Sequence, residues 1–552
     1  MSIMTEYSIL IGGKAGDGIT QAGQVIGSLF TSMGYHVYIY VDYQSLIRGG
    51  HNFCILRAAD KPISAHRSGI DFLLALDQQT VDLHAEKLND KGVIIYDNEK
   101  VRAKGQGVAI QAIVKKIEGK PIMANTAVIG ALCKIAGIPW ERVLPVLTKK
   151  FPKGTDKNLK IAKEAYASAT PLFEIPVLVD ANYPLFSGNE WIGLGLLAGG
   201  LDAYIAYPMT PSSGVLHFLA DVAEETGIIV YHPESEIAVV LMAEGCAYAG
   251  KKTAVGTSGG GFCLMTEGIS LAGQAEIPLV IVLAQRAGPS TGIPTYNAQS
   301  DLLFACHAGH GEFPRYIVAP GTPDEAYRFS AEALNKSWKY QILSIILSDK
   351  NFSEGYFSCE SLPESPVAAP LTSPSFPYER YANGSDGISP FLAPPYHGEI
   401  IKVNSYTHDS AGITTEDPET AIASVKKRLA KTAALAAETD VPDAVYTAGL
   451  IGCETVLVCW GSTRGVVSEV AESLGLKIVS PIVLAPFPKN TFSDAIKGSK
   501  TIILVEESTS GQLDRILTSE GFIVHKKILR YDGRPFLVEE LINEVLRVQH
   551  GQ

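Results

Sequence analysis

The sequence lacks the closely spaced cysteines that an iron–sulfur site needs. None of its eight cysteines occurs in a C-x-x-C pair, and most stand inside apolar segments. A cluster is held by several thiolates, which short cysteine spacings usually supply. We therefore expect reduced, buried thiols and no iron–sulfur cluster on this chain.

The sequence is also poor in basic residues and in long apolar runs. Its 46 Lys and Arg residues stand against 58 Asp and Glu residues, which gives a net charge of −12, and no basic cluster could face phosphates. This argues against nucleic acid as a partner. Apolar runs such as 277–284 have the length of a core strand, far short of a bilayer span. Because no charged leader precedes an apolar core at the N-terminus, we expect a cytoplasmic protein without a membrane partner.

The 552 residues suffice for three or four domains of about 150 residues each. Strand-like and helix-like patterns alternate along most of the chain, which is typical of α/β domains with parallel sheets. The predicted organisation is an α/β domain at 1–175, a linker at 176–186, a second α/β domain at 187–350, a proline-rich arm with a helix at 351–440, and a third α/β domain at 441–552. Aromatic residues among the prolines predict an ordered but irregular arm.

The first domain opens with a strand at 7–11, a glycine loop and a helix, and a second strand at 36–41 follows. This order predicts a right-handed βαβ unit. Gly16-Asp17-Gly18 in the loop resembles the start of a Mg²⁺–diphosphate motif, but the asparagine pair that should follow is absent from 42–47. The dinucleotide fingerprint fails as well, because Gln21 occupies the third glycine position. Gly16 and Gly18 are therefore either a structural turn or a phosphate cradle.

The second domain contains a distinctive loop, Tyr207-Pro-Met-Thr-Pro-Ser-Ser213, between an apolar run and an amphipathic one. We expect Thr210 to cap the following helix, with Pro211 in its first turn. A helix N-terminus at the carboxyl end of a strand also attracts anions. An ordinary N-cap threonine is the alternative interpretation.

Three further positions in this domain carry polar groups just past predicted strands or at a helix start. Glu236 begins a helix and is either a solvated acid or a partly desolvated carboxylate suited to proton exchange. The run Ser258-Gly-Gly-Gly261 lets a ligand approach the backbone closely, and Arg286 can grip a carboxylate. One crevice at the carboxyl ends of the strands can contain Thr210, Ser258 and Arg286.

These segments resemble the 2-oxoacid:ferredoxin oxidoreductases, specifically an α subunit with the γ domain fused ahead of it. The loop at 207–213 departs from the family's Y-P-I-T-P-S-S only at Met209. The other matches are E-S-E-I-A at 234–238, T-S-G-G-G-F at 257–262, R-A-G-P-S-T-G-I-P-T at 286–295, and V-E-E at 505–507 with G-Q-L at 511–513. The resemblance implies a γ-type domain, a thiamine-diphosphate pyrimidine-type domain and a transketolase C-terminal-like domain.

The resemblance also implies an activity and partners. Enzymes of this family decarboxylate 2-oxoacids oxidatively, form acyl-CoA from coenzyme A, and pass electrons to ferredoxin. Thiamine diphosphate, its Mg²⁺ and a [4Fe-4S] cluster are carried mainly by a separate β subunit, which agrees with the missing asparagines and clustered cysteines. The implied partners are this β subunit and ferredoxin, in an (αβ)2 heterotetramer. 2-Oxoglutarate is the implied substrate, with pyruvate and branched-chain 2-oxoacids as alternatives.

By similarity, Glu236 would hydrogen-bond N1′ of the thiamine aminopyrimidine and serve in catalysis. Thr210 and Arg286 would hold the substrate carboxylate, while Thr291 and His310 would lie near the far end of the substrate. Gly16 and Gly18 would contribute to cofactor binding, with coenzyme A as the candidate; no residue of this chain is expected to bind a metal. Two other classes stay open from the sequence: a non-redox thiamine enzyme subunit and a regulatory module that binds coenzyme A or a nucleotide.

Overall fold

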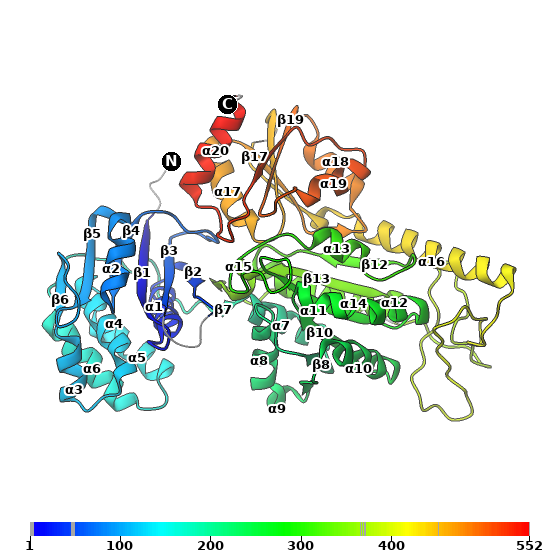
Figure 1. Ribbon diagram of the computed structural model, residues 1–552, viewed down its shortest axis with the longest axis horizontal. Coiled ribbons are helices and arrows are strands. Elements are labelled where there is room, and N and C mark those ends of the chain that lie inside the picture. Colours follow the sequence, from blue (N-terminus) through cyan, green and yellow to red (C-terminus); the bar gives the residue numbers. More distant parts are fainter. Residues whose placement is uncertain are drawn as a thin grey trace. The chain divides into compact units, whose positions relative to one another are not determined.

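The structure is a computed structural model that describes residues 5–45, 50–364, 366, 368, 371–450 and 452–550. It is built from α/β sheets, as predicted (Figure 1). The chain forms two compact units: unit 1 comprises Met1–Ser187, Glu354–Leu362 and Leu537–Glu540, and unit 2 comprises Gly188–Ser353, Pro363–Phe536 and Leu541–Gln552. Among the described helices, none combines the length and the apolar character that a membrane span requires.

Unit 1 is organised around one mixed sheet. In spatial order its described strands are β6 (Gln106–Val108), β5 (Leu88–Asp97), β4 (Ile70–Ala75), β1 (Glu6–Lys14), β3 (His51–Ala59), β2 (His36–Asp42), β14 (Tyr356–Ser358) and β7 (Leu185–Ser187). β6, β5, β4 and β1 are parallel, whereas β3 runs antiparallel to both β1 and β2. β1 and β2 are thus parallel but not adjacent, so the predicted βαβ unit has a third strand inserted in it.

The short connection between β2 and β3 explains why β3 pairs with β2 in the antiparallel direction. Only eight residues connect β2 to β3, which is too short for the crossover that a parallel neighbour would need. β14 and β7 extend the same sheet antiparallel, and the sequence did not predict them. Each has three residues, too few for a strand pattern to be recognised.

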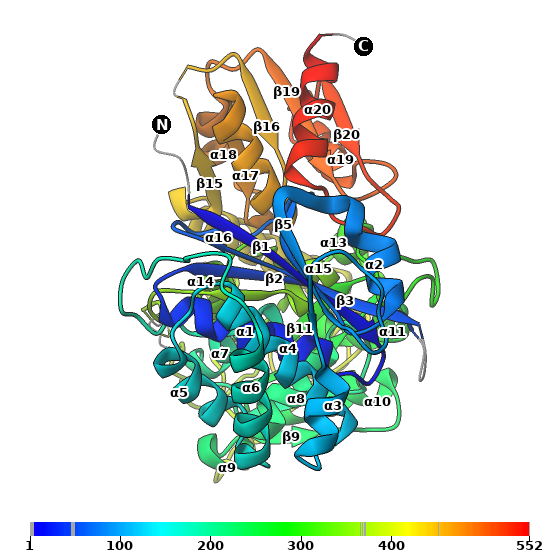
Figure 2. The ribbon, with the colours of Figure 1, turned by 90° about the vertical axis from the view of Figure 1, so that its left-hand side faces the viewer.

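Helices cover the sheet of unit 1 (Figure 2). They are α1 (Ile19–Ser32), α2 (Gln78–His84), α3 (Ile110–Lys116), α4 (Ala124–Ile135), α5 (Trp140–Lys150) and α6 (Thr155–Ser168). Alternate strand residues, such as Ile9 and Ile11 or Val37 and Ile39, join one apolar core with α1, α4 and α6. This two-residue period is the pattern expected where one face of a strand is packed against helices.

Unit 2 contains a sheet in the order β18 (Val483–Ala485), β12 (Arg315–Val318), β13 (Leu343–Asp349), β11 (Leu279–Gln285), β10 (Thr253–Thr257), β8 (Ala203–Ala206) and β9 (Ile229–Tyr231). All neighbours are parallel except β18, which is antiparallel to β12. The helices before, between and after these strands are α7 (Gly188–Ala198), α8 (Ser213–Asp221), α9 (Ala223–Thr226), α10 (Glu236–Tyr248), α11 (Gly259–Leu264), α12 (Thr266–Ala275), α13 (Leu302–His307), α14 (Pro323–Tyr340) and α15 (Lys350–Glu354).

A second sheet of unit 2 is built from the C-terminal part of the chain. Its order is β15 (Val445–Ala448), β17 (Lys477–Pro481), β16 (Thr455–Val458), β19 (Thr501–Glu506) and β20 (Lys526–Leu529), and only β15 is antiparallel. Its helices are α17 (Thr463–Leu474), α18 (Lys489–Ile496) and α19 (Gln512–Ser519), and the last helix of the chain is α20 (Val538–Gln549). We call this part, residues 442–536, the C-terminal domain.

The cysteines differ in part from the expectation of burial. Cys54, Cys133 and Cys459 are buried, but Cys263 is exposed and the others are intermediate. Cys263 lies on the outward side of the short helix α11, whose amphipathic character cannot be seen from the apolar run around it.

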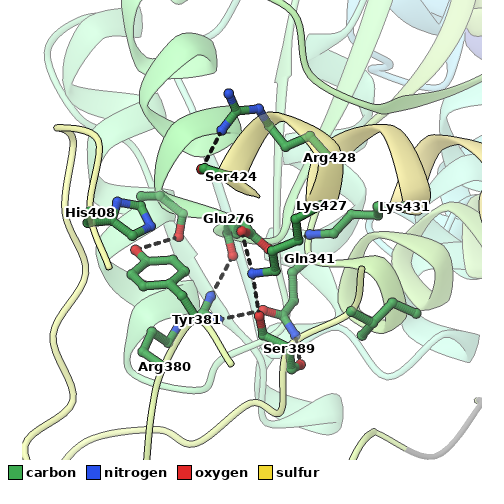
Figure 3. A network of polar contacts seen from close by, with 12 residues as sticks. Glu276, Gln341, Arg380, Tyr381, Ser389, His408, Ser424, Lys427, Arg428 and Lys431 are labelled. Atoms are coloured by element: carbon green, nitrogen blue, oxygen red, sulfur yellow. Dashed lines mark hydrogen bonds and ion pairs between the residues drawn. The ribbon is translucent and has the colours of Figure 1, made fainter. Parts of the chain in front are cut away.

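Within the described residues of 359–417, the proline-rich arm forms no helix or strand, and a buried charge network joins it to the ends of α12 and α14 (Figure 3). Glu276 accepts hydrogen bonds from Lys427 at 2.7 Å and from Lys431 at 2.5 Å, both on α16 (Pro418–Thr439). Arg380 of the arm donates to the backbone oxygen of Glu276 and to Gln341 Oε1, each at 2.6 Å. Lys427 also donates to Ser389 of the arm.

Glu276 and Gln341 occupy positions that normally favour glycine. They end α12 and α14 with φ values of 51° and 52°, in the left-handed region. Burial alone would raise the pKa of Glu276, but Lys431, Lys427 and Arg380 hold that pKa well below its usual range. Burial lowers the pKa of Lys427 to about 8. The network therefore depends on one carboxylate that balances several buried cations.

We predict that Glu276→Gln lowers the free energy of unfolding of unit 2 by about 3–5 kcal/mol, because it leaves Lys427 and Lys431 buried without their carboxylate. Denaturant unfolding measures the loss, and limited proteolysis of the arm should become faster. Glu454→Gln is the matched control, since its ion pair with Lys500 is exposed and should contribute little. Equal effects of the two substitutions would contradict this account.

Candidate active site

Four loops of unit 2 gather at one edge of the seven-stranded sheet. They follow β8, β9, β10 and β11, which are parallel neighbours and so end at the same edge. β9 and β10 lie on opposite sides of β8, so the loops after β8 and β10 diverge there. Such a switch point is where α/β sheets bind ligands.

Arg286 and Thr210 meet at this edge. Arg286 Nη1 donates a hydrogen bond to the backbone oxygen of Thr210 at 2.9 Å. A second contact joins neighbouring loops, because the Thr257 hydroxyl lies 4.0 Å from the Met209 sulfur. The loops after β8, β10 and β11 therefore form one cluster, as the sequence predicted for Thr210 and Arg286.

Thr210 does not cap the helix, contrary to the expectation. α8 begins at Ser213, with Ser212 in the N-cap position, and Ser212 N–H donates to the Met209 backbone oxygen at 2.9 Å. Asn189 Nδ2 donates to the Pro211 backbone oxygen at 2.8 Å. A tight turn thus precedes the helix and places Thr210 before its first turn, beside Arg286.

Glu236 is buried at the start of α10, with 4% of its surface exposed. Ser235 caps the helix by accepting from the Ala238 N–H. A Cβ on Gly261 would lie 2.6 Å from Glu236 Oε1, so this glycine leaves the room that the carboxyl group occupies. The interpretation of Glu236 as a solvated acid is therefore wrong.

Glu236 Oε1 has no hydrogen-bond partner among the described residues, and neither does the buried hydroxyl of Ser258. A buried carboxyl oxygen without a partner is costly, because it has lost its water and gained nothing in return. Both groups belong to the loops at this edge. A ligand that donates to Glu236 would satisfy it.

Asp301 is a member of the site that the sequence analysis missed. Its Oδ2 would lie 2.8 Å from a Cβ on Gly259, and its N–H donates to Gln285 Oε1 at the end of β11. Burial raises the pKa of Asp301 to about 6. Asp301 lies outside every motif that the sequence analysis singled out, and its contacts with Gln285 and Gly259 bring it to the edge.

The loop after β11 is closed on itself. Ile293 N–H donates to the Ala287 backbone oxygen at 2.9 Å, and the two residues form a β-bridge. Gly292 has φ 53°, and a Cβ there would lie 1.9 Å from the Ala287 oxygen, so only glycine fits. Thr291 stands exposed at the tip of this loop.

His310 lies elsewhere in unit 2. Its N–H donates to Ser270 Oγ on α12 at 2.9 Å, and its side chain lines a pocket with Glu267 and Arg428. The structure thus brings Thr210, Arg286, Glu236 and Ser258 to one edge and leaves His310 outside that cluster.

Gly16 and Gly18 lie in the turn before α1 of unit 1. Both have positive φ, and a Cβ on Gly18 would lie 2.6 Å from Asn125 Nδ2. The carboxylate of Asp17 folds back to accept from the Lys14 N–H at 2.8 Å. Within the described residues, nothing lies within 4 Å of a Cβ on Gly16. The backbone favours glycine at both positions, and Gly18 is packed against Asn125, whereas the space beside Gly16 is open.

No group of three or more His, Cys, Asp or Glu side chains is arranged to hold a metal ion in the described part of the chain. Carboxyl and hydroxyl groups, together with one guanidinium group, make up the site. These groups can bind a carboxylate and exchange a proton.

Comparison with known proteins identifies this arrangement. The family model for the thiamine-diphosphate-binding part of pyruvate flavodoxin/ferredoxin oxidoreductases matches residues 195–427, and that for pyruvate ferredoxin/flavodoxin oxidoreductase matches residues 8–168. The 2-oxoacid:ferredoxin oxidoreductase subunit alpha of Saccharolobus solfataricus is 28% identical over 97% of this chain and 96% of its own length. The 2-oxoglutarate oxidoreductase subunit KorA of Mycobacterium tuberculosis is 27% identical over 78% of this chain and 69% of its own length.

A solved structure agrees with these matches. The 2-oxoglutarate:ferredoxin oxidoreductase of Magnetococcus marinus, with 2-oxoglutarate, coenzyme A and succinyl-CoA bound, has a TM-score of 0.88 at 27% identity and covers 98% of this chain. The fold and these matches together define an α/β oxidoreductase subunit that acts on 2-oxoacids. The chain belongs to the family of 2-oxoacid:ferredoxin oxidoreductase α subunits, which excludes the non-redox enzyme and the regulatory module.

We predict that Arg286→Ala raises the KM for the 2-oxoacid by about 10- to 100-fold with a smaller change in kcat, because a charge-assisted hydrogen bond contributes roughly 1.5–3 kcal/mol. Steady-state kinetics of the assembled enzyme measure both constants. Arg328→Ala is the control, since its ion pair with Asp443 lies at a partly exposed position outside the edge. An unchanged KM in Arg286→Ala would refute the role of this residue.

Proposed function

We propose that this chain is the α subunit of an enzyme that oxidatively decarboxylates 2-oxoglutarate, with coenzyme A and ferredoxin as co-substrates. The observation that carries the proposal is the buried, unsatisfied carboxyl oxygen of Glu236 on the same sheet edge as the Arg286–Thr210 contact. A proton-exchanging acid and a carboxylate-binding cation are the two groups that this chemistry requires from the protein.

The residues at the edge fit thiamine diphosphate. Glu236 Oε1 needs a hydrogen-bond partner, and N1′ of the aminopyrimidine would provide it. Gly261 keeps the space at the carboxyl group free of a side chain. When bound, thiamine diphosphate supplies a carbon nucleophile for the keto group of the 2-oxoacid. Glu236 would hold and return the proton on N1′, in a place from which water is excluded.

The substrate carboxylate would be held by Arg286 and Thr210. Because Arg286 Nη1 is engaged with the Thr210 backbone oxygen, the plane of the guanidinium group is set before the substrate arrives. Thr291, at the exposed tip of the loop, is proposed to face the far end of the substrate. The preference for 2-oxoglutarate over pyruvate and branched-chain 2-oxoacids rests on the ligands of the Magnetococcus marinus enzyme.

The remaining components complete the proposal. A β subunit would carry the diphosphate end of the cofactor, its Mg²⁺ and the [4Fe-4S] cluster, in an (αβ)2 heterotetramer that reduces ferredoxin in the cytoplasm. Coenzyme A would be the acyl acceptor. The open turn at Gly16, next to Gly18, is proposed to contact its phosphates.

An exposed apolar face beside Glu236 supports the docking of a β subunit. Ile237, Leu241 and Met242 on α10 and Leu264 on α11 are each between 42% and 52% exposed. We call these four residues the α10 face; Ile237 directly follows Glu236 in the chain, and α11 follows the β10 strand of the same edge. A partner that covers this face would also close the site from water.

The proposed function is tested by the purified αβ complex. Ferredoxin reduction should require both coenzyme A and a 2-oxoacid, with the highest kcat/KM for 2-oxoglutarate. A higher kcat/KM for pyruvate or a branched-chain 2-oxoacid would refute the substrate assignment. Failure of every 2-oxoacid to reduce ferredoxin would refute the proposed reaction.

We predict that Glu236→Gln lowers kcat by about 10²–10⁴-fold, because an amide keeps the shape of the side chain but cannot exchange the proton. The complex should still assemble with its partner and bind the cofactor. Glu234→Gln is the matched control, since Glu234 is exposed two residues away. Turnover of Glu236→Gln close to that of the wild type would disprove the assignment.

We predict that Leu241→Asp prevents co-purification of the β subunit, because it places a charge in the apolar α10 face. Ile523→Asp is the control, since Ile523 is exposed in the C-terminal domain and lies outside that face. Circular dichroism should show that both variants are folded. Normal assembly of Leu241→Asp would contradict the proposed interface.

A further inference from the structure

The C-terminal domain forms hydrogen bonds with the segment 297–303, which follows the loop that carries Arg286 and Thr291. Asn297 N–H donates to the Gly533 backbone oxygen at 2.9 Å, and Gln299 N–H donates to the Glu507 backbone oxygen at 2.7 Å. Four residues after Gln299, the Leu303 N–H donates to Gln512 Oε1 at 2.8 Å. The segment 297–303 is therefore held at several points by one domain.

The side chain of Glu507 makes one of these contacts with the segment 297–303. It is 4% exposed, and it accepts a short hydrogen bond from Asn297 Nδ2 and a second bond from the Phe536 N–H at 3.3 Å. Asn297 Oδ1 accepts from the Asn351 N–H at 2.9 Å, which sets the orientation of the amide. The buried Nδ2 group must then point at an acceptor, and Glu507 is that acceptor.

Gln299 completes the connection within the buried interface. Its Oε1 accepts from the Glu507 N–H at 3.0 Å and from the Thr463 hydroxyl at 2.6 Å, and its Nε2 donates to the Trp460 backbone oxygen at 2.8 Å. The neighbouring Glu506 does not contact this segment through these bonds; its carboxylate accepts hydrogen bonds from the N–H groups of Gln512 and Leu513 at the start of α19. The two adjacent acids therefore make different contacts: Glu506 stabilises the C-terminal domain internally, whereas Glu507 binds the segment that follows the loop.

The loop after β11 forms a closed hairpin, in which the Ala287 N–H also donates to the Tyr296 oxygen at 3.1 Å. Its tip, with Ser290 and Thr291, is exposed, and its base is closed by the Ala287–Ile293 bridge and by Tyr296 N–H, which donates to the Ile293 oxygen at 3.1 Å. Arg286 directly follows β11 and precedes this closed hairpin, and Asn297 follows it. The direction of the hairpin is set by where these two ends are held.

Resting on the proposed function, we propose that Glu507 is a positioning residue for the 2-oxoacid: through Asn297 it fixes the loop after β11, and thereby the placement of Arg286 and Thr291 around the substrate. Glu507 lies outside the cluster of Thr210, Glu236 and Arg286, so it acts on substrate binding without touching the reacting atoms. Removal of its acceptor should loosen the loop and raise KM, while the chemistry on bound substrate is preserved.

The protonation state of Glu507 provides an independent readout. Burial and the nearby carboxylate of Asp349 raise its pKa to about 8, while the bonds from Asn297 and Phe536 and the charge of Arg530 act in the opposite direction. Folding therefore favours the protonated acid. The contribution of this group to the free energy of unfolding falls as pH rises from the usual glutamate range to about 8. Above that pH, ionised Glu507 faces Asp349 inside the interface.

The test compares Glu507→Gln and Glu507→Leu with the wild type in the αβ complex, with ferredoxin reduction by 2-oxoglutarate as the assay. Gln keeps the acceptor for Asn297, so its KM at pH 7 should stay within about threefold of the wild type. Leu removes the acceptor at a similar volume, and its KM should rise about tenfold or more with kcat within about twofold. An unchanged KM in Glu507→Leu, or a fall in kcat alone, would overturn the proposal.

The pH profile keeps the proposal testable if Glu507→Leu does not assemble. Wild-type KM should rise above pH 8, whereas the KM of Glu507→Gln should stay flat, and the thermal unfolding midpoints should diverge over the same range. Parallel profiles of the two proteins would overturn the proposal. The activity of the wild-type complex tests the proposed function separately. A wild-type complex without activity would refute the proposed function, whereas the Glu507 variants test only the positioning role.

Discussion

The parallel pairing of β9, β8, β10 and β11 is the constraint on which the active site depends. Parallel neighbours end at a common edge, so four loops separated by up to about 80 residues in the chain meet without any need for local sequence proximity. The split of the loops at β8 opens that edge to a ligand. Glu236, Thr210, Arg286 and Ser258 gain their significance from this arrangement, because each alone is an ordinary helix-start or strand-end residue.

Two buried polar interfaces connect separate parts of unit 2. One is the set of hydrogen bonds by which Glu507, Gln299 and Gln512 connect the C-terminal domain to the segment after the substrate loop. The other is the network around Glu276, which ties the irregular arm and α16 to the ends of α12 and α14. Both use charged or polar groups away from water, where each group needs a defined partner. The first interface lies next to the substrate loop, whereas the second lies at the amino ends of β11 and β13, away from the site.

The sequence was informative where local patterns decide the structure. The loop at 207–213 after an apolar run, the helix that starts at Glu236 and the position of Arg286 near Thr210 follow from apolar runs, glycines and caps, and the structure confirms them. It was uninformative where distant segments decide. The insertion of β3 between β1 and β2, the strand β14, the partners of Glu276 and the place of Asp301 all arise from pairing across long sequence separations. Thr210 was misassigned as a cap because a tight turn and a helix start have similar sequences.

The central claim is that the unsatisfied carboxyl oxygen of Glu236 is the protein's contact to the aminopyrimidine of thiamine diphosphate. The most direct measurement is the rate at which the C2 proton of bound thiamine diphosphate exchanges with deuterium in the assembled complex, followed by NMR after rapid quench. The account predicts that exchange slows by orders of magnitude in Glu236→Gln while cofactor affinity stays close to that of the wild type. Equal exchange rates in the two proteins would contradict it.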